Sequence, residues 1–547
     1  MPFYKLFRFC HTIRYLTFRQ VFYRLYYKFI RVRLHELGEL SLREWVASWN
    51  FTPWSNLSTK DAEEFTFLGV KGRVFDSIDW QAGKHSKLWL YNLHYLDDLN
   101  AYGIDRQPEL ARRLIQKWRH ANPPMAGEGW EPYPLSLRIV NLVKWFACNN
   151  FRAADQLYCL GQQADALSQQ IEYHILGNHL FSNGKALVFA GTYLDGAFAD
   201  RWLIQGLRIL DREIPEQFLQ DGAHFELSPM YHATMLWDVC DLINLARCSG
   251  VAALSERLSL WSSILARGLH WLESMLHPDG RIAFFNDAAF GIAPEYSKIL
   301  EYAKKLGVYP PVLSQQKAIF NAASGYVAVV PCNRVKALLD VASVGPDYQP
   351  GHAHADTLSF ELSVFGRRLI VNSGTSQYGE DLECHRQRST AAHSTVEVDG
   401  HNSSEVWAGF RVARRARPMV QRFDVQQGSI IIHASHDGYR HLPGRPVHHR
   451  QWKFTSDELE IVDKVVGRQT TSVARLYLHP DIKIQQVDGA FVIDIGGRDK
   501  AYIELQGADR VTLMASTWHP EFGLSLDNQC IEAVFTKNSL LTRIRWS

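Results

Sequence analysis

The sequence lacks the cysteine patterns that mark zinc ribbons and disulfide frameworks. Its eight cysteines are scattered, and no two of them form a Cys-x-x-Cys pair. This distribution is typical of free thiols in a reducing compartment. No apolar run reaches the roughly 20 residues that a membrane-spanning helix needs. The chain also lacks helix-turn-helix, RNP and zinc motifs, which argues against nucleic acid as a partner.

Acidic residues are absent from the first 35 positions, and the first one in the sequence is Glu36. Aromatic and aliphatic residues interleave there with bases at positions 5, 8, 14, 19, 24, 28, 31 and 33. A secretory signal instead has a short basic start followed by an uninterrupted apolar segment. The pattern over residues 1–34 is typical of a basic amphipathic helix, and such helices can lie on an anionic membrane surface. The alternative is a first helix that packs on its own domain with its bases in water.

The middle of the sequence has the spacing of amphipathic helices without intervening strands. At 547 residues, with 46% hydrophobic and 21% charged residues, the chain is expected to form two or three globular domains. Apolar residues recur at helical spacing in 108–118, 135–146, 153–171, 202–214, 230–246 and 258–275. Successive helices of this kind predict a bundle, a solenoid or a toroid. No fixed-period repeat identifies a known helical array.

The pattern changes near residues 307–318, and short alternating runs follow. They cover residues 325–330, 335–341, 429–433, 458–466, 473–478, 490–495, 501–505 and 541–546. Many short strands at close spacing predict an antiparallel sandwich. We therefore expect an α+β multidomain chain, with a basic lead-in over 1–84, a helical domain over 85–315 and an antiparallel β-sandwich over 316–547.

Two histidines stand at the head of one predicted strand. Residues 351–356 read GHAHAD and lead into an alternating apolar run. In a strand, His352 and His354 would point to the same face, with Asp356 on the same side. His393 enters a later strand. Such a group fits a metal pair, a catalytic pair or an ordinary polar strand entry.

Another polar stretch lies at a predicted helix start in the helical half. Residues 177–185 read GNHLFSNGK. Asn178 is suited to cap the helix at its N-terminus. Alternatively, it forms part of an anion site together with Asn183 and Lys185.

A second helix is expected to begin at Ser228 and Pro229, because proline is favoured in the first turn of a helix. Tyr231 then lies near the positive end of the helix dipole, which favours a lowered phenol pKa. The alternative is a tyrosine that packs against the neighbouring helix.

Basic residues cluster in two stretches of the β-half, 411–417 and 440–450. A run of charge is usually a solvated face. Here the two stretches are equally suited to a groove for a polyanion.

Six segments together resemble a known family. They are 92–96 (NLHYL), 130–138 (WEPYPLSLR), 177–179 (GNH), 225–232 (FELSPMYH), 351–356 (GHAHAD) and 392–395 (AHST). In this order they are similar to the heparinase II/III family of polysaccharide lyases, which has relatives among the alginate lyases. The resemblance implies an incomplete α/α toroid followed by an antiparallel β-sandwich.

The resemblance also implies a reaction and a set of catalytic residues. These lyases cleave polysaccharides that contain uronic acid by β-elimination. The enzyme must neutralise the uronate carboxylate, remove the proton beside it and protonate the leaving oxygen. The resemblance implies that Asn178 and His179 hold the carboxylate, and that Tyr231 donates the proton and in syn elimination also accepts one. His352 would be the base for the other epimer or a further neutraliser, and Tyr378 a second tyrosine of the site.

Three further residues are expected to bind the anionic polysaccharide, namely Glu226, Arg388 and Arg414. Neither the polymer, nor endo or exo action, nor the oligomeric state follows from the residues.

A structural zinc, held by His, Asp and His, is often present in this family. His354 and His393 match the two histidine positions, but Asn372 stands at the position of the Asp. A neutral amide is a weak zinc ligand. Asp356 is the candidate substitute, so a structural zinc is expected only if this carboxylate reaches the site.

Two other functions compete with an active lyase. The first is a non-catalytic protein that binds a polyanionic polysaccharide or assembles an exopolysaccharide. The second, a glycoside hydrolase, ranks last because it needs two carboxylates across the site, and Glu226 alone does not make the pair. Without a visible export signal, we expect a cytoplasmic protein or one peripheral to the inner face of the membrane, with the periplasm as the alternative.

Overall fold

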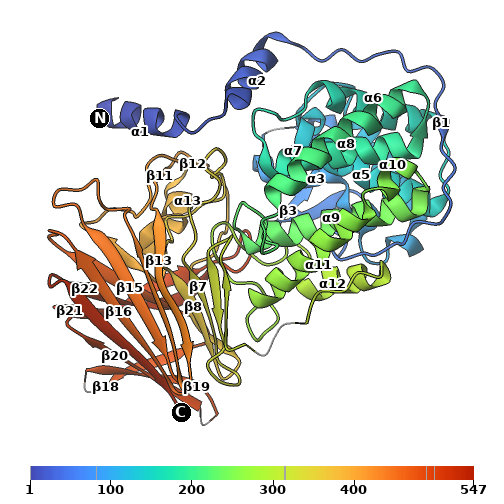
Figure 1. Ribbon diagram of the computed structural model, residues 1–547. Helices are drawn as coiled ribbons and strands as arrows, with labels where there is room; N and C mark the ends of the chain where they lie inside the picture. The colour runs from blue at the N-terminus through green and yellow to red at the C-terminus, as the bar shows by residue number, and fades with distance from the viewer. Residues whose placement is uncertain (1, 82, 313–315, 488, 498) are drawn as a thin grey trace.

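The computed structural model describes residues 2–81, 83–312, 316–487, 489–497 and 499–547. Figure 1 shows a helical half and a β-half side by side, with the first two helices crossing above them. Within the described residues, none of the helices is both long enough and apolar enough to cross a bilayer. The domain boundary expected at 315 falls on residues 313–315, which lie outside the described residues.

The helical half follows the predicted periodicity closely. Its helices are α3 (Lys87–Tyr95), α4 (Pro108–Ala121), α5 (Pro132–Asn149), α6 (Ala154–Gln169), α7 (Gly177–Tyr193), α8 (Ala197–Gln217), α9 (Pro229–Ser249), α10 (Ala252–Ser255), α11 (Leu258–Ser274) and α12 (Tyr296–Lys305). Every residue of α7 except His179 is buried, because α5, α6, α8 and α9 all pack against this helix. The N-terminus of α7 is therefore held rigidly in the centre of the helical half.

The β-half is a sandwich of two antiparallel sheets, as the short alternating runs predicted. The first sheet has the order β21-β22-β17-β9-β8-β7-β6-β5, and β10 also pairs with β17. Its strands are β5 (Ala318–Asn321), β6 (Tyr326–Val329), β7 (Lys336–Asp340), β8 (Phe360–Val364), β9 (Arg367–Val371), β10 (Val396–Val398), β17 (Ser472–Leu478), β21 (Arg510–Trp518) and β22 (Leu526–Phe535). Inward-facing Phe360, Trp452, Phe454 and Phe491 help to fill the core between the sheets.

The second sheet has the order β13-β14-β15-β16-β23-β20-β19-β18. Its strands are β13 (Pro418–Gln426), β14 (Ser429–His436), β15 (Val447–Phe454), β16 (Glu458–Val466), β18 (Lys483–Val487), β19 (Ala490–Gly496), β20 (Asp499–Gln506) and β23 (Ser539–Trp546). Alternating burial along β14, β15 and β16 reflects one face toward the core and one toward water.

Short elements complete the fold. Three small pairings are β1 (Ser41–Leu42) with β4 (Leu194–Asp195), β2 (Glu64–Phe67) with β3 (Val70–Arg73), and β11 (Val406–Trp407) with β12 (Arg411–Val412). The remaining helices are α1 (Pro2–Ile13), α2 (Phe18–Phe29) and α13 (Leu382–Gln387).

A buried ion pair connects the two sheets behind the loops that carry the histidines. Arg450 lies opposite Asp463 on neighbouring strands and binds it through Nε and Nη2, at 2.7 and 2.9 Å. Its Nη1 donates to the carbonyls of Leu358 and Ser394, each at 2.8 Å. These two carbonyls end the segments that carry His354 and His393, so one guanidinium fixes both.

Burial opposes the ionisation of Asp463, but Arg450 and a hydrogen bond from His448 outweigh it and lower the pKa of Asp463 to about 2. An unfolded aspartate has a pKa of about 3.9. The carboxylate thus stabilises the folded state above that value, by on the order of 2–3 kcal/mol, and this contribution is lost as the pH falls through the folded pKa.

Replacing Asp463 by Asn should destabilise the sandwich by about 3–5 kcal/mol at neutral pH, because it leaves the Arg450 charge buried without a counter-charge. Urea denaturation followed by tryptophan fluorescence measures this. The matched control is Asp424→Asn, which removes an exposed carboxylate paired with Arg422 and should leave the midpoint unchanged. Equal midpoints for the two variants would refute the structural role of Asp463.

Candidate functional site

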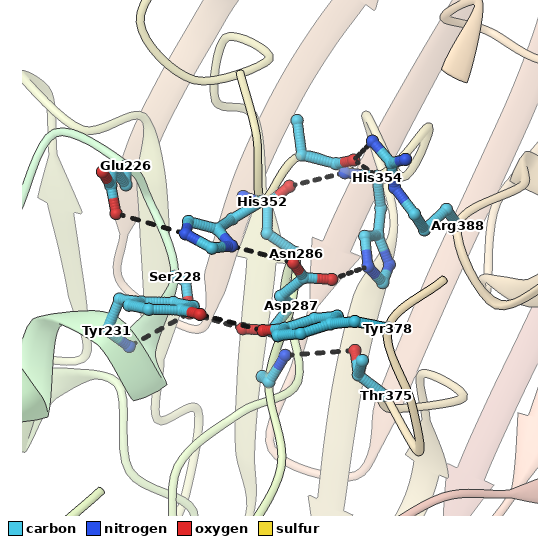
Figure 2. A network of polar contacts seen from close by, with 12 residues as sticks. Glu226, Ser228, Tyr231, Asn286, Asp287, His352, His354, Thr375, Tyr378 and Arg388 are labelled. Atoms are coloured by element: carbon cyan, nitrogen blue, oxygen red, sulfur yellow. Dashed lines mark hydrogen bonds and ion pairs between the residues drawn. The ribbon is translucent and has the colours of Figure 1, made fainter. Parts of the chain in front are cut away.

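The carboxylate of Asp287 lies between two imidazoles where the two halves meet (Figure 2). His352 Nδ1 is 2.9 Å from Oδ2 of Asp287, and His354 Nε2 is 2.9 Å from Oδ1. Burial disfavours the charge on Asp287, but the hydrogen bonds from the two histidines outweigh burial and lower the pKa of Asp287 far below its ordinary value. Because an ionised carboxylate only accepts hydrogen bonds, His352 carries its proton on Nδ1 and leaves Nε2 directed away from Asp287.

The two histidines lie on a loop, so their predicted place in a strand is wrong. Strand β8 begins only at Phe360, and residues 351–358 form turns. Leu358 has a φ of 64°, and Ser359 donates its backbone N–H to Asp356, which closes the turn before the strand. The two rings meet at Asp287 because each of them forms a hydrogen bond with this carboxylate. The alternation of side chains along a strand does not bring them together.

Two tyrosines stand beside His352. The Tyr231 and His352 rings stack with centroids 3.7 Å apart, and the Tyr231 hydroxyl is 2.9 Å from that of Tyr378. Tyr231 comes from the first turn of α9, whose N-cap is Ser228 with Pro229 next, as predicted. Ser228 fixes this turn further, since its hydroxyl donates to the Asp287 carbonyl at 2.6 Å. Both tyrosines and His352 are partly exposed, so a solute can reach them.

The predicted lowering of the Tyr231 pKa is wrong. Burial raises the pKa of Tyr231 well above its ordinary value, and the nearby negative charge of Asp287 adds to the effect. Burial and Asp287 also raise the pKa of Tyr378. A helix N-terminus stabilises a phenolate by roughly 0.3–1 kcal/mol. The cost of removing that charge from water is larger. Both phenols therefore carry their protons at neutral pH and are suited to donate them.

Asn178 is held by a buried carboxylate. Glu226 accepts from the Asn178 backbone N–H at 3.1 Å and from its side-chain amide at 2.8 Å. The same amide nitrogen lies 3.3 Å from His352 Nε2. Asn178 is not the N-cap of α7, since that position is Leu176. Glycine is required at position 177, because a Cβ there would lie 2.3 Å from Glu226 Oε1 and the φ is +59°.

Glu226 supports the site from within and is closed to solvent. Burial opposes its ionisation, but His352, His224 and the hydrogen bonds from Asn178 outweigh burial and lower the pKa of Glu226. Its side chain is 0% exposed. The expected direct contact of Glu226 with a substrate is therefore replaced by a role in positioning Asn178.

His179 is the one partly exposed residue of α7, and Glu172 holds its ring. The His179 Nδ1 is 3.0 Å from Glu172 Oε1, and the ring stacks on Tyr133 at 4.2 Å. Burial opposes protonation, but Glu172 outweighs it and raises the pKa of His179 above its ordinary value. A cation at this position is suited to face a carboxylate.

The remaining polar residues of the 177–185 stretch do not join an anion site. Asn183 donates to Glu172 Oε2 at 3.0 Å and so supports the partner of His179. Lys185 is buried between Asp238 and Asp241, at 2.6 and 2.7 Å. Its charge is therefore compensated inside the helical half.

The two predicted arginine ligands lie behind or beside the site. Arg388 is buried and donates through Nε and Nη2 to the Ala353 carbonyl, so it fixes the loop between His352 and His354. Arg414 forms a bidentate pair with Glu405 and lies over the Phe7 ring of α1. Burial overturns direct substrate binding by Arg388, whereas Arg414 is partly exposed and its binding of substrate stays a prediction.

The donors expected for a structural zinc do not form a suitable set. His354 Nδ1 and His393 Nε2 are 3.2 Å apart, but Asp287 lies on the opposite ring nitrogen of His354. Asn372 accepts from the Ser394 N–H and donates to the Phe284 carbonyl. Asp356, the proposed substitute, accepts from the Asn286 N–H at 3.0 Å. Among the residues that the structure describes, no group of three or more His, Cys, Asp or Glu side chains could hold a metal ion.

Four residues that organise the site were not predicted, and one of them is Glu172, which holds the His179 ring. Asp287 orients both histidines, and the side chain of Asn286 accepts from the His354 N–H and donates to the Leu227 carbonyl. Tyr133 supports His179. Asn286 and Asp287 form a polar pair inside the otherwise apolar stretch 282–290, which is the signal that could have identified them.

Among the described residues, four of the fourteen non-glycine residues with positive φ lie beside these segments. Leu176, Leu227, Asn286 and Leu358 all have positive φ, between 57° and 71°. Each of them lies within four residues of Asn178, Glu226, Asp287 or His354. Non-glycine residues in this conformation are disfavoured by on the order of 1–3 kcal/mol and tend to cluster at functional sites.

Comparison with known proteins places both halves in one family. Residues 75–311 match the family model described as Heparinase II/III N-terminus, and residues 316–547 match Heparinase II/III-like, C-terminal. A heparin-sulfate lyase of Bacteroides stercoris is 25% identical over 367 residues, which are 62% of this chain and 52% of that protein. One of Pedobacter heparinus is 27% identical over 311 residues, 50% of this chain and 44% of that protein. The chain thus spans about half the length of the curated relatives it matches.

Solved structures share the fold. A crystal structure of heparinase III has a TM-score of 0.69 at 18% identity, with 85% of this chain and 79% of that chain covered. The heparan sulfate lyase of Pedobacter heparinus has a TM-score of 0.58 at 18% identity, with 89% and 81% covered. These likenesses confirm the predicted fold class, an incomplete α/α toroid followed by an antiparallel β-sandwich. Together, the two matched domains show that the chain belongs to the heparinase II/III family.

Proposed function

We propose that this protein is a polysaccharide lyase that cleaves a uronic-acid-containing polysaccharide by β-elimination. One observation carries the proposal. The Tyr231 hydroxyl, the His352 ring and the Asn178 amide meet at a partly exposed position, with a buried carboxylate behind each of the last two. This arrangement provides a proton donor, a base and a neutral amide donor within one small site.

The difficulty of the reaction lies in the substrate. The proton next to a uronate carboxylate is very weakly acidic, because its removal adds a second negative charge to the same group. Fixed donors that face the developing charge lower this barrier without having to reorganise. The Asn178 amide and the His179 ring, whose pKa Glu172 raises, are the residues that would face the uronate carboxylate.

The base that the geometry favours is His352. Its Nδ1 proton is directed to Asp287, and Glu226 Oε2, 3.7 Å from Nε2, would stabilise the imidazolium that forms when Nε2 accepts the substrate proton. In the substrate-free site the Asn178 amide lies 3.3 Å from this nitrogen. A uronate that draws the amide toward its own carboxylate would therefore free Nε2 at the same time.

Tyr231 is suited to protonate the leaving glycosidic oxygen. Its raised pKa keeps the phenol protonated until the oxygen develops charge. Tyr378, at 2.9 Å, can donate a hydrogen bond to the phenolate that forms and so stabilise it until it takes up a proton from water.

The substrate class rests on the names of the relatives, since two of them are called heparin-sulfate lyase. Heparan sulfate is therefore the first polymer to test, beside alginate, chondroitin sulfate and a bacterial capsular uronan. Elimination creates an unsaturated uronate that absorbs ultraviolet light, and hydrolysis does not. We expect absorbance to rise with at least one polymer; reducing ends without absorbance, or binding without any cleavage, would overturn the proposal.

Replacing Tyr231 by Phe should lower kcat by roughly 10²–10⁴-fold, because the leaving oxygen loses its proton donor while the ring stack on His352 is kept. Substrate affinity, measured by calorimetry with uncleaved polymer, should change little. Tyr309→Phe is the matched control, because Tyr309 is exposed in the segment between the two halves. Retention of full activity by the Tyr231 variant would contradict its role as the acid.

Replacing Asp287 by Asn should also reduce kcat on the order of 10²–10⁴-fold, since an amide no longer dictates which nitrogen of His352 carries the proton. The nitrogen-15 chemical shifts of the imidazole report the tautomer directly, and should change in this variant. An unchanged tautomer together with unchanged kcat would show that Asp287 has only a packing role. Asp424→Asn again serves as the control for an exposed aspartate.

A further inference from the structure

An apolar stripe on the first two helices faces away from the rest of the protein. In α2 it consists of Phe18, Phe22, Leu25 and Phe29, whose spacing of four, three and four residues places them on one face. Phe18 and Phe29 are 84% and 81% exposed. Leu6, Phe9 and Ile13 continue the pattern in α1 and are also exposed. In Figure 1 both helices lie at the outer edge of the molecule.

The opposite face of α2 is anchored to both halves. Gln20, the only buried residue of α2, donates through its amide to the carbonyls of Tyr348 and Ile175, at 3.0 and 3.5 Å. The Tyr27 hydroxyl donates to the Ile171 carbonyl at 2.5 Å, and Tyr23 packs on Tyr173 with ring centroids 4.6 Å apart. Because this face is fixed, the apolar stripe cannot turn inward to find cover within the same chain.

α1 is tied down at the other end. The Trp407 indole donates to the Thr12 hydroxyl at 3.1 Å, and Arg415 lies over the Tyr15 ring at 3.9 Å. The two helices therefore form one fixed element that runs from β11 and β12 to the start of α7. We call the exposed apolar residues of this element, together with its basic residues, the N-terminal face.

The charge of the N-terminal face indicates what covers it. Eight Lys and Arg residues precede the first acid, Glu36. The bases around Phe29 are exposed: Lys28 precedes it, and Arg31 and Arg33 follow it. A second copy of the chain would bring the same positive charge against this one, which opposes self-association. An anionic bilayer offers a counter-charge to the bases and an apolar interior to the rings.

We propose that the N-terminal face docks on an anionic lipid surface. A 12-residue helix is about 18 Å long, so α1 and α2 would lie in the plane of the interface with their rings below the headgroups. The lysine and arginine side chains would reach the lipid phosphates. The proposal concerns where the protein is held and does not depend on the reaction proposed above.

Co-sedimentation of the full chain with vesicles tests this proposal. We expect binding to phosphatidylcholine vesicles that contain phosphatidylglycerol, and roughly tenfold weaker binding to phosphatidylcholine alone. The double substitution Phe18→Ser and Phe29→Ser should reduce the binding at least tenfold. Val312→Ser is the matched control, because Val312 is 93% exposed in the segment between α12 and β5, and its loss should leave binding unchanged.

A charge variant separates the electrostatic contribution to vesicle binding from the apolar one. Lys28→Glu, Arg31→Glu and Arg33→Glu together should abolish the preference for phosphatidylglycerol, and added salt should do the same to the parent protein. Circular dichroism confirms that each variant is folded. Failure to sediment with either vesicle would overturn the proposal. So would light scattering that shows a dimer lost in the Phe18 and Phe29 variant, or an acidic protein that binds this face while vesicles do not.

Discussion

The site depends on one buried carboxylate shared by two imidazoles. Asp287 comes from the segment between α11 and α12 of the helical half, and both histidines come from the loop before β8 of the sandwich. Their hydrogen bonds therefore join the halves at the same time as they orient His352. The backbone repeats this connection, because the Asp287 N–H donates to the His352 carbonyl at 2.9 Å. Domain assembly and the protonation pattern of the site are consequences of the same contact.

Desolvation decides the protonation states around this carboxylate. It holds Tyr231 and Tyr378 as neutral phenols, although Tyr231 stands at a helix N-terminus. His179 is the exception, because the adjacent Glu172 outweighs burial and favours the cation. The site thus combines two protonated phenols with an imidazole whose pKa is raised, so its groups favour donating hydrogen bonds and protons.

Local features of the fold were predictable from the sequence, and contacts across the halves were less so. The helix start at Ser228 and Pro229 follows from capping preferences, and the strands follow from alternation. The resemblance brought together Asn178, Tyr231 and His352, which the structure confirms as neighbours. Asp287 was not predicted because the two histidines that it binds lie 65 and 67 residues further along the chain. No local sequence pattern connects residues so far apart. The histidines do not lie in the expected strand because Leu358, whose backbone is in the left-handed conformation, closes a turn there.

The left-handed leucines have an evolutionary consequence. Leu176, Leu227 and Leu358 are buried as well as strained. Glycine would relieve the backbone at these positions but forfeit about 2–5 kcal/mol of buried side chain. Residues other than glycine would keep the backbone strain and would pack in the core less well than leucine. Neither kind of mutation is tolerated easily, so the main-chain path around the reactive groups is expected to resist drift. Descendants of this protein that bind a different ligand should differ in the exposed side chains at the rim, on an unaltered backbone.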